Sequence, residues 1–127
     1  MSKNVTPQVG SIGWMDLTIA DAATTRDFYR AVVGLEPSGV DMGGYEDFMM
    51  TPPGGGDPVC GVCHARGSNA DLPPVWIPYF IVADIEISLT ECEVRGGSRI
   101  TPVKTMGDAR YCVIRDPAGA VCALYQP

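Results

Sequence analysis

Apolar and polar side chains alternate along residues 14–20, which is the period of a strand with one buried face. One face of this expected strand carries Met15, Leu17 and Ile19, and the other carries Trp14, Asp16 and Thr18. Because a short chain must bury its aliphatic side chains, we expect the first face to pack against a helix. The second face then holds the side chains that are available for chemistry.

The pattern changes to a helical period directly after this strand. Asp21 is the expected N-cap of a helix over residues 22–33, because its carboxylate can accept from the first free N–H groups. Phe28 and Val32 lie four residues apart and predict the buried stripe of that helix. Gly34 is expected to end the helix in a left-handed conformation.

The same order of signals occurs twice. Ile19-Ala20-Asp21 and Val82-Ala83-Asp84 each end an apolar run, and each is followed thirteen residues later by glycine. Both correspondences give one offset, 84 − 21 = 63 and 97 − 34 = 63. The offset also places Leu17 on Phe80, Phe48 on Tyr111, Met50 on Val113 and Gly56 on Gly119.

Each copy therefore predicts a strand, a helix and three further strands. In the first copy the later strands are expected over residues 35–41, 45–51 and 58–65. The second copy predicts strands over residues 75–83, 98–104, 110–115 and 120–126, with a helix from Asp84 to about residue 95 that buries Ile85, Leu89 and Cys92. The sequence predicts an α+β fold in one domain, residues 11–126, with module 1 over about 11–65, a linker over 66–74 and module 2 over about 75–126.

Composition excludes several classes of partner. The chain has 127 residues and a net charge of -6, so we expect no nucleic acid and no anionic membrane as partner. The first twenty residues lack an apolar stretch of signal-peptide length, and we expect a cytoplasmic protein. Five cysteines, an odd number, favour free thiols. The single histidine, His64, excludes sites built from several imidazoles.

Three motifs in order resemble the vicinal oxygen chelate superfamily, which includes glyoxalases, bleomycin-resistance proteins and extradiol dioxygenases. The motifs are Trp14-x-Asp16-Leu17-x-x-x-Asp21 leading to Phe28-Tyr29 and Gly34, Tyr79-Phe80-x-Val82-x-Asp84 leading to Gly96-Gly97, and Asp116-Pro117-x-Gly119. The resemblance implies that two β-α-β-β-β modules pair into a cupped, half-open barrel around a small-molecule cavity. It also implies a homodimer.

Metal-binding members of this superfamily use one ligand on the first and last strand of each module. The first-strand positions fall on Trp14 and Ile77, and a last-strand position falls on Ala123. The remaining position falls on Cys60, or on Val59 or Gly61 if the repeat slips by one residue, which would reverse the facing of the strand. At most one soft ligand is left, so we expect no metal and no other cofactor.

The alternation of side chains between the two faces of each strand, which we call parity, identifies the candidate site residues. Asp16 lies in an apolar strand, where desolvation would raise its pKa toward the range of a general base. The favoured alternative is a structural anion that accepts hydrogen bonds from neighbouring strands. His64 is the second candidate base, with a solvent-exposed structural role as its alternative. The same parity predicts ligand contacts from Trp14, Thr18, Tyr79 and Tyr125, with Ile77, Ile81 and Val121 beside them. Cys60 is a further expected ligand contact, although the sequence leaves open which face of its strand lines the cavity.

The segment Cys60-Gly-Val-Cys63-His64 matches the C-x-x-C-H pattern of covalent haem attachment. A Cys/Cys/His zinc or redox site is a second interpretation. In a strand the two thiols and the imidazole would point to opposite faces, so we favour two small buried thiols and a polar residue near a strand end.

The sequence predicts a glyoxalase-like protein that binds a small organic molecule, a drug or a metabolite, in an apolar, aromatic-lined cavity without a metal. The alternative is a metal-independent lyase or isomerase that uses Asp16 or His64 as base and Tyr79 or Tyr125 as oxyanion donor. A dimeric scaffold with a vestigial pocket is a third possibility.

Overall fold

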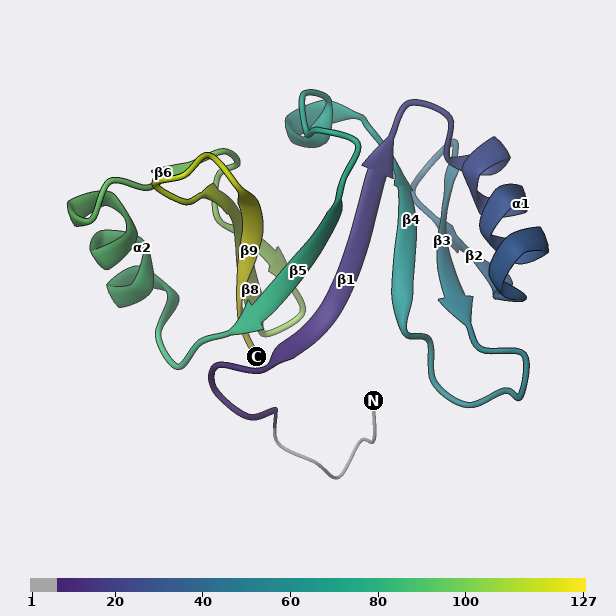
Figure 1. Cartoon of the computed structure of the whole chain (residues 1–127), viewed down its shortest axis with the longest axis horizontal. Coiled ribbons are helices and arrows are strands. Elements are labelled where there is room, and N and C mark those ends of the chain that lie inside the picture. Colours follow the sequence, from purple (N-terminus) through teal and green to yellow (C-terminus); the bar gives the residue numbers. More distant parts are fainter. Residues whose placement is uncertain (1–6) are drawn as a thin grey trace. The chain divides into compact units, whose positions relative to one another are not determined.

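The computed structural model describes residues 7–127 and divides them into two compact units (Figure 1). Unit 1 comprises residues 15–76, and unit 2 comprises residues 77–127 together with residues 7–14. Strands and one α-helix occur in each unit, which confirms the α+β fold. Across the described residues, no helix is both long and apolar enough to cross a membrane.

Unit 1 is a mixed sheet with one helix beside it (Figure 1). Its elements are β1 (Ile12–Ile19), α1 (Ala22–Val33), β2 (Glu36–Asp41), β3 (Glu46–Thr51) and β4 (Cys60–His64), and the first residues of β1 belong to unit 2. The strand order is β2-β3-β4-β1, with β1 and β4 parallel and the other pairs antiparallel. The segment that follows, expected as a linker, holds only the short 3-10 helix η1 (Gly67–Asn69).

Unit 2 repeats this plan. Its elements are β5 (Trp76–Ile81), α2 (Ile85–Val94), β6 (Ser98–Arg99), β7 (Lys104–Met106), β8 (Ala109–Arg115) and β9 (Val121–Gln126), and Trp76, the first residue of β5, belongs to unit 1. β5 lies parallel to β9, β8 lies antiparallel to β9, and β6 and β7 both pair with β8. Residues 7–14 join this unit through hydrogen bonds of Gly10 and Ser11 with Ile81.

The strand expected over residues 98–104 is interrupted, so that prediction was wrong in its extent. Pro102 has no N–H to give to the ladder. The N–H groups of Ile100 and Thr101 both donate to the carbonyl of Val113, while the Thr101 hydroxyl accepts from the Val113 N–H at 3.0 Å. The side chain of a buried threonine therefore replaces a backbone partner between β6 and β7.

Both helices begin at the predicted aspartates. Asp21 accepts from the N–H of Thr24 at 3.0 Å, and Asp84 accepts from the N–H groups of Glu86 and Ile87. Gly34 ends α1 with φ 85° in the left-handed region, as the sequence predicts. Local chemistry therefore fixes the ends of these helices.

The buried stripe predicted for α1 was wrong. Phe28 is 55% exposed and Val32 is 64% exposed. The helix packs on the sheet through Ala22 and Tyr29, with the guanidinium of Arg26 between them, 4.5 Å above the centre of the Phe48 ring. Ala22, Arg26 and Tyr29 are spaced by four and three residues, as expected for one face of a helix. Because the middle residue is an arginine, the pattern of apolar residues alone does not reveal this face.

Each unit has its own apolar core between its helix and its sheet. The core of unit 1 contains Ala22, Leu35, Phe48, Met50, Cys60 and Val62, with Met15, Ile19, Tyr29 and Trp76 packed against them. The core of unit 2 contains Ile85, Leu89, Cys112, Ile114 and Leu124, with Val82, Cys92, Val103 and Cys122 packed against them. The buried face predicted for α2 is confirmed by Ile85, Leu89 and Cys92.

The 63-residue repeat holds for the first strand and helix of each unit but slips in the later strands. Asp16 pairs with Gly61, whereas Tyr79, its counterpart, pairs with Ala123. The counterpart of Ala123 is therefore Gly61, and the expectation of Cys60 at that position was wrong. A slip of one residue reverses the facing of a strand, because the side-chain period is two.

The slip also changes which residue of unit 2 corresponds to Phe48. Phe48 lies opposite Val62 and packs toward α1, as Cys112 lies opposite Leu124 and packs toward α2. Phe48 therefore corresponds to Cys112 and not to Tyr111. This leaves Tyr111 on the face of the unit 2 sheet that lies opposite α2.

Candidate functional site

In each unit the sheet has one face packed on its helix and an opposite face, which we call the distal face. In unit 1 the distal face carries Asp16 and Thr18 on β1, Cys63 on β4 and Asp47 on β3. Thr18 pairs with Cys63 and is only 3% exposed, and Asp16 is half-buried. Two carboxylates and a thiol therefore share this face.

The Cys63 thiol is held in its neutral form. Burial raises its pKa well above the ordinary value for cysteine, and the charges of Asp16 and Asp47 raise it further. The thiol donates a hydrogen bond to the Asp47 carboxylate, which also accepts from the His64 N–H at 2.8 Å. Such a thiol is a hydrogen-bond donor and a poor nucleophile.

His64 lies on the other face of the same sheet. It pairs with Ile19 in the register of β1 and β4, and its ring packs edge-on against Tyr45 with the ring centres 5.7 Å apart. The guanidinium of Arg66 covers the Tyr45 ring at 4.0 Å. Strand alternation therefore separates the two candidate bases, Asp16 and His64, by the thickness of the sheet.

Cys60 also lies away from the distal face. It is a buried member of the unit 1 core, and burial raises the pKa of its thiol. Cys60 and Cys63 point to opposite faces of β4, so the C-x-x-C-H segment does not gather its side chains around one cofactor. Within residues 7–127, no group of three or more His, Cys, Asp or Glu side chains is placed to hold a metal ion.

The distal face of unit 2 carries three tyrosines, Tyr79 on β5, Tyr111 on β8 and Tyr125 on β9, which we call the tyrosine cluster. The ring centres of Tyr79 and Tyr111 are 6.0 Å apart, and Tyr111 lies directly opposite Tyr125 in the register. Tyr79 is 8% exposed, and Tyr125 is half-buried. Two of the three tyrosines were predicted from parity in the sequence.

Tyr111 and Lys104 were not predicted from the sequence as site residues. Lys104 pairs with Tyr111 in the register of β7 and β8, and its ammonium nitrogen lies 6.0 Å from the centre of the Tyr111 ring. Burial lowers the pKa of Lys104. The alternation of β8 carries the signal for Tyr111, but the 63-residue offset places Tyr111 on Phe48, which packs toward α1.

Aliphatic side chains surround the tyrosine cluster. Ile77, Ile81, Val113 and Ala123 are buried and share the parity of Tyr79, Tyr111 and Tyr125. Trp14, which is half-buried, belongs to the part of β1 that lies in unit 2. The distal face of unit 2 is therefore apolar and aromatic, whereas that of unit 1 is polar.

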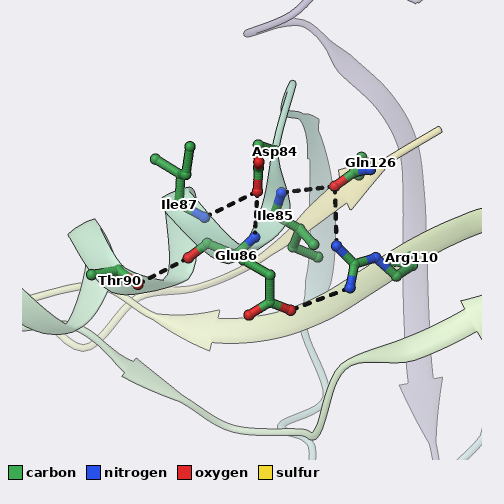
Figure 2. Close-up of polar contacts among 7 residues, drawn as sticks. All are labelled: Asp84, Ile85, Glu86, Ile87, Thr90, Arg110 and Gln126. Carbon is green, nitrogen blue, oxygen red and sulfur yellow. Dashed lines mark hydrogen bonds and ion pairs between the residues drawn. The ribbon is translucent and has the colours of Figure 1, made fainter.

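On the face of the unit 2 sheet that packs on α2, a group of hydrogen bonds surrounds the start of this helix. Figure 2 shows the Gln126 side chain accepting from the N–H of Ile85 at 2.9 Å and from Arg110 at 3.4 Å. Arg110 also forms an ion pair with Glu86 at 3.3 Å (Figure 2). These contacts fix the last strand to the helix N-terminus, and Arg110 acts here as a structural residue.

The residues at the four ligand positions of the metal-binding relatives do not fit a metal ion. Those positions hold Trp14, Ile77 and Ala123, and the register assigns the fourth to Gly61. None of these side chains has an oxygen, sulfur or imidazole nitrogen to donate.

A family model of the Glyoxalase/Bleomycin resistance protein/Dioxygenase superfamily matches residues 11–124. The chain belongs to this superfamily. The family resemblance predicted from the sequence motifs is thereby confirmed for most of the chain.

Curated relatives are about twice as long as this chain. It is 28% identical to "Putative glyoxylase CFP32" of Mycobacterium tuberculosis over 136 aligned positions, which cover 99% of this chain and 49% of the relative. It is 33% identical to "Anthracycline biosynthesis protein DauV" of Streptomyces sp. (strain C5), over 92% of this chain and 47% of the relative. The chain spans about half the length of both.

Solved structures share the fold. The Streptomyces coelicolor methylmalonyl-CoA epimerase, in complex with 2-nitronate-propionyl-CoA, matches with a TM-score of 0.61 and 17% identity, over 94% of this chain and 98% of the epimerase. The Mycobacterium tuberculosis methylmalonyl-CoA epimerase matches with a TM-score of 0.57 and 13% identity, over 98% of this chain and 93% of the epimerase. At these identities the likeness concerns the fold alone.

Proposed function

We propose that this protein binds a small, planar organic molecule on the tyrosine cluster of unit 2, without a metal ion. The observation that carries the proposal is the gathering of Tyr79, Tyr111 and Tyr125 on one apolar sheet face. Aromatic rings stack with planar ligands, and the phenolic hydroxyls can donate to a carbonyl or phenolate oxygen. An apolar surface with a few polar groups is what such ligands require.

The names of two relatives support a polycyclic aromatic ligand. The Streptomyces relatives DnrV and DauV are both named as anthracycline biosynthesis proteins. Anthracyclines are planar, fused-ring molecules that carry carbonyl and phenol groups, which match the donors of the tyrosine cluster. We therefore propose a ligand of this chemical class, which the protein sequesters or presents in a pathway.

Titration of the purified protein with the fluorescent anthracycline daunorubicin tests this proposal. Saturable binding is expected, and Tyr111→Ala should weaken it by about three- to tenfold, which corresponds to the ~0.5–1.5 kcal/mol of an aromatic contact. Tyr45→Ala is the matched control, because Tyr45 lies in unit 1 against His64 and outside the cluster. Equal affinities of the wild type, Tyr111→Ala and Tyr45→Ala would contradict the proposal.

A metal-independent lyase or isomerase is the second candidate function. Asp16 favours it, because this carboxylate lies half-buried on a distal face beside a neutral thiol. Two matching solved structures are methylmalonyl-CoA epimerases, and the α-proton of methylmalonyl-CoA is acidic. A carboxylate base that removes such a proton would form an enolate.

Deuterium exchange distinguishes this candidate from a binding protein. The protein would be incubated with methylmalonyl-CoA and with 2-oxo acids in D₂O, and exchange of the α-proton followed by mass spectrometry. If Asp16 is the base, Asp16→Asn abolishes the exchange, while His64→Gln and the exposed control Asp27→Asn retain it. Exchange that is unchanged in Asp16→Asn and lost in His64→Gln would assign the base to His64, and no exchange with any compound would favour binding alone.

A further inference from the structure

We propose that Lys104 gives the tyrosine cluster a preference for planar ligands that carry an acidic group, a carboxylate or an ionised phenol, at one end. This inference rests on the proposed function, since it concerns the same face of unit 2. Lys104 lies on β7, and its ammonium nitrogen is 6.0 Å from the centre of the Tyr111 ring. A positive charge therefore lies beside the aromatic surface.

The sheet fixes the direction of the Lys104 side chain. Lys104 lies directly opposite Tyr111 in the antiparallel register of β7 and β8. Residues that lie opposite each other share a face of the sheet, and their Cβ atoms are about 5 Å apart. Val103, the preceding residue, packs against the core of unit 2 on the α2 side. Lys104 is therefore held on the distal face, next to the cluster.

Four side chains form a row across this face. Ile81 on β5 lies opposite Tyr125 on β9, Tyr125 lies opposite Tyr111 on β8, and Tyr111 lies opposite Lys104. Neighbouring strands are about 4.8 Å apart, so the backbones at Tyr125 and Lys104 are separated by about 10 Å across β8. A fused three-ring molecule has about this length, so it can lie over both tyrosines and reach the lysine.

The chemical character changes along the row. Ile81, at one end, is apolar and only 2% exposed, whereas Tyr125, Tyr111 and Lys104 are half-buried. Burial lowers the pKa of Lys104, because the sheet removes part of the water around its ammonium group. Attraction between unlike charges is stronger where water is partly excluded. The row therefore suits a ligand with apolar rings and one acidic end.

An acidic oxygen of a stacked ligand can reach the ammonium group. A charge-assisted hydrogen bond from an ammonium to a carboxylate is about 2.8 Å long. Because the Lys104 nitrogen is 6.0 Å from the Tyr111 ring centre, an oxygen at that distance from the nitrogen can belong to a ligand in contact with the ring. The ammonium has three N–H donors, and the oxygen needs only one of them.

The arginines of unit 2 already have partners. Three of them form ion pairs with glutamates of α2: Arg95 with Glu91, Arg99 with Glu93 and Arg110 with Glu86. Arg115 donates to the carbonyl of Gly119 and lies at the end of β8, four residues from Tyr111. Among the cations of unit 2, Lys104 is therefore the one placed to meet an acidic group on the cluster.

Calorimetric titration with a matched pair of ligands tests the inference. Anthraquinone-2-carboxylate and anthraquinone-2-carboxamide have the same fused rings, and only the first is charged at neutral pH. The wild type should bind the carboxylate about three- to tenfold more tightly, as expected for a charge-assisted hydrogen bond that is partly shielded from water. Lys104→Met, which keeps an unbranched side chain without the charge, should bind both ligands with the affinity that the wild type has for the carboxamide.

Two further variants separate the local charge from other effects. Arg95→Met is the matched control, because it removes one positive charge from the same unit at a side chain that is 78% exposed on α2. It should keep the preference of the wild type for the carboxylate. Lys104→Arg retains the charge and should restore much of the preference, whereas Tyr111→Ala should weaken both ligands to a similar extent.

Failure of the inference and failure of the proposed function give different results. Equal affinity of the wild type for the two ligands, or a preference for the carboxylate that survives in Lys104→Met, would overturn the inference and leave the proposed function standing. Loss of both ligands in Lys104→Met would also overturn it, because the lysine would then support the structure of the site. A wild type that binds neither ligand would contradict the inference and the proposed function together.

Discussion

At the scale of single residues, the reactivity of each cysteine thiol in unit 1 depends on the side chains that surround it. Cys63 and Cys60 are three positions apart in the sequence, and both look like small buried thiols. Only the structure shows that Cys63 lies with two carboxylates while Cys60 lies in the core. The difference follows from the period of two in β4, which sends the two side chains to opposite faces.

We predict that Asp47→Asn makes Cys63 more reactive. Burial is the main cause of the raised pKa of this thiol and remains, but replacing the charged Asp47 carboxylate by a neutral amide, which is a weaker hydrogen-bond acceptor, lowers the pKa. More thiolate is then present at a given pH, and alkylation of Cys63 by iodoacetamide at about pH 8 should be several times faster. Peptide mass spectrometry measures the rate, and Asp27→Asn is the control that should leave it unchanged.

At the scale of elements, neighbouring residues in the sequence determine where a helix begins and ends, whereas contacts with distant segments determine which of its faces is buried. Asp21 and Asp84 cap α1 and α2 as their sequence context predicts, because a cap needs only the next three residues. The buried side of α1 depends on the sheet below it, which accepts Arg26 over Phe48 and leaves Phe28 in solvent. Element types could therefore be predicted from the sequence, and the contacts of α1 could not.

The cap at Asp21 predicts a pH dependence of stability. Hydrogen bonds from the Thr24 N–H and the Thr24 hydroxyl lower the pKa of Asp21 below its ordinary value of 3.8. A group whose pKa is lower in the folded state stabilises the protein above its unfolded pKa, and the contribution is lost as the pH falls through the folded pKa.

Asp21→Ala should accordingly lower the Tm at neutral pH, and the difference from the wild type should shrink as the pH falls below about 4. Thermal unfolding followed by circular dichroism at a series of pH values provides the measurement. Asp27→Ala, which removes an exposed carboxylate from the same helix, serves as control and should show a small difference from the wild type. A Tm difference for Asp21→Ala that grows toward acid pH would contradict this assignment of the cap.

The packing of α2 on β8 gives a second prediction at this scale. A Cβ at Gly97 would lie 2.6 Å from the Cys92 sulfur and 2.9 Å from the carbonyl oxygen of Arg115, which is backbone and has little freedom to move. Gly97→Ala should therefore lower the free energy of unfolding by about 1–3 kcal/mol, the usual cost of overpacking. Chemical denaturation measures it, and Gly54→Ala, with open space around the added methyl, should differ from the wild type by less than about 0.5 kcal/mol.

At the scale of the whole chain, the positions at which metal-binding members of the superfamily carry a ligand lack donor side chains. This chain has Trp14, Ile77, Gly61 and Ala123 at those positions. We expect that EDTA leaves the Tm unchanged and that added Zn²⁺ or Ni²⁺ does not raise it, because a ligand stabilises only if it binds the folded state. A stoichiometric divalent metal in the purified protein, measured by mass spectrometry, would contradict this expectation.

The sequence by itself determined the two copies of β-α-β-β-β, the helix caps and the family, because alternation, capping and turn residues are local or repeated signals. Two site residues of the tyrosine cluster, Tyr79 and Tyr125, also followed from parity along single strands. The tertiary structure alone decided the register between strands, which assigns Gly61 as the counterpart of Ala123 and adds Tyr111 to the cluster. Register depends on hydrogen bonds between distant segments, and with a period of two a slip of one residue is enough to move a side chain from the core to the site.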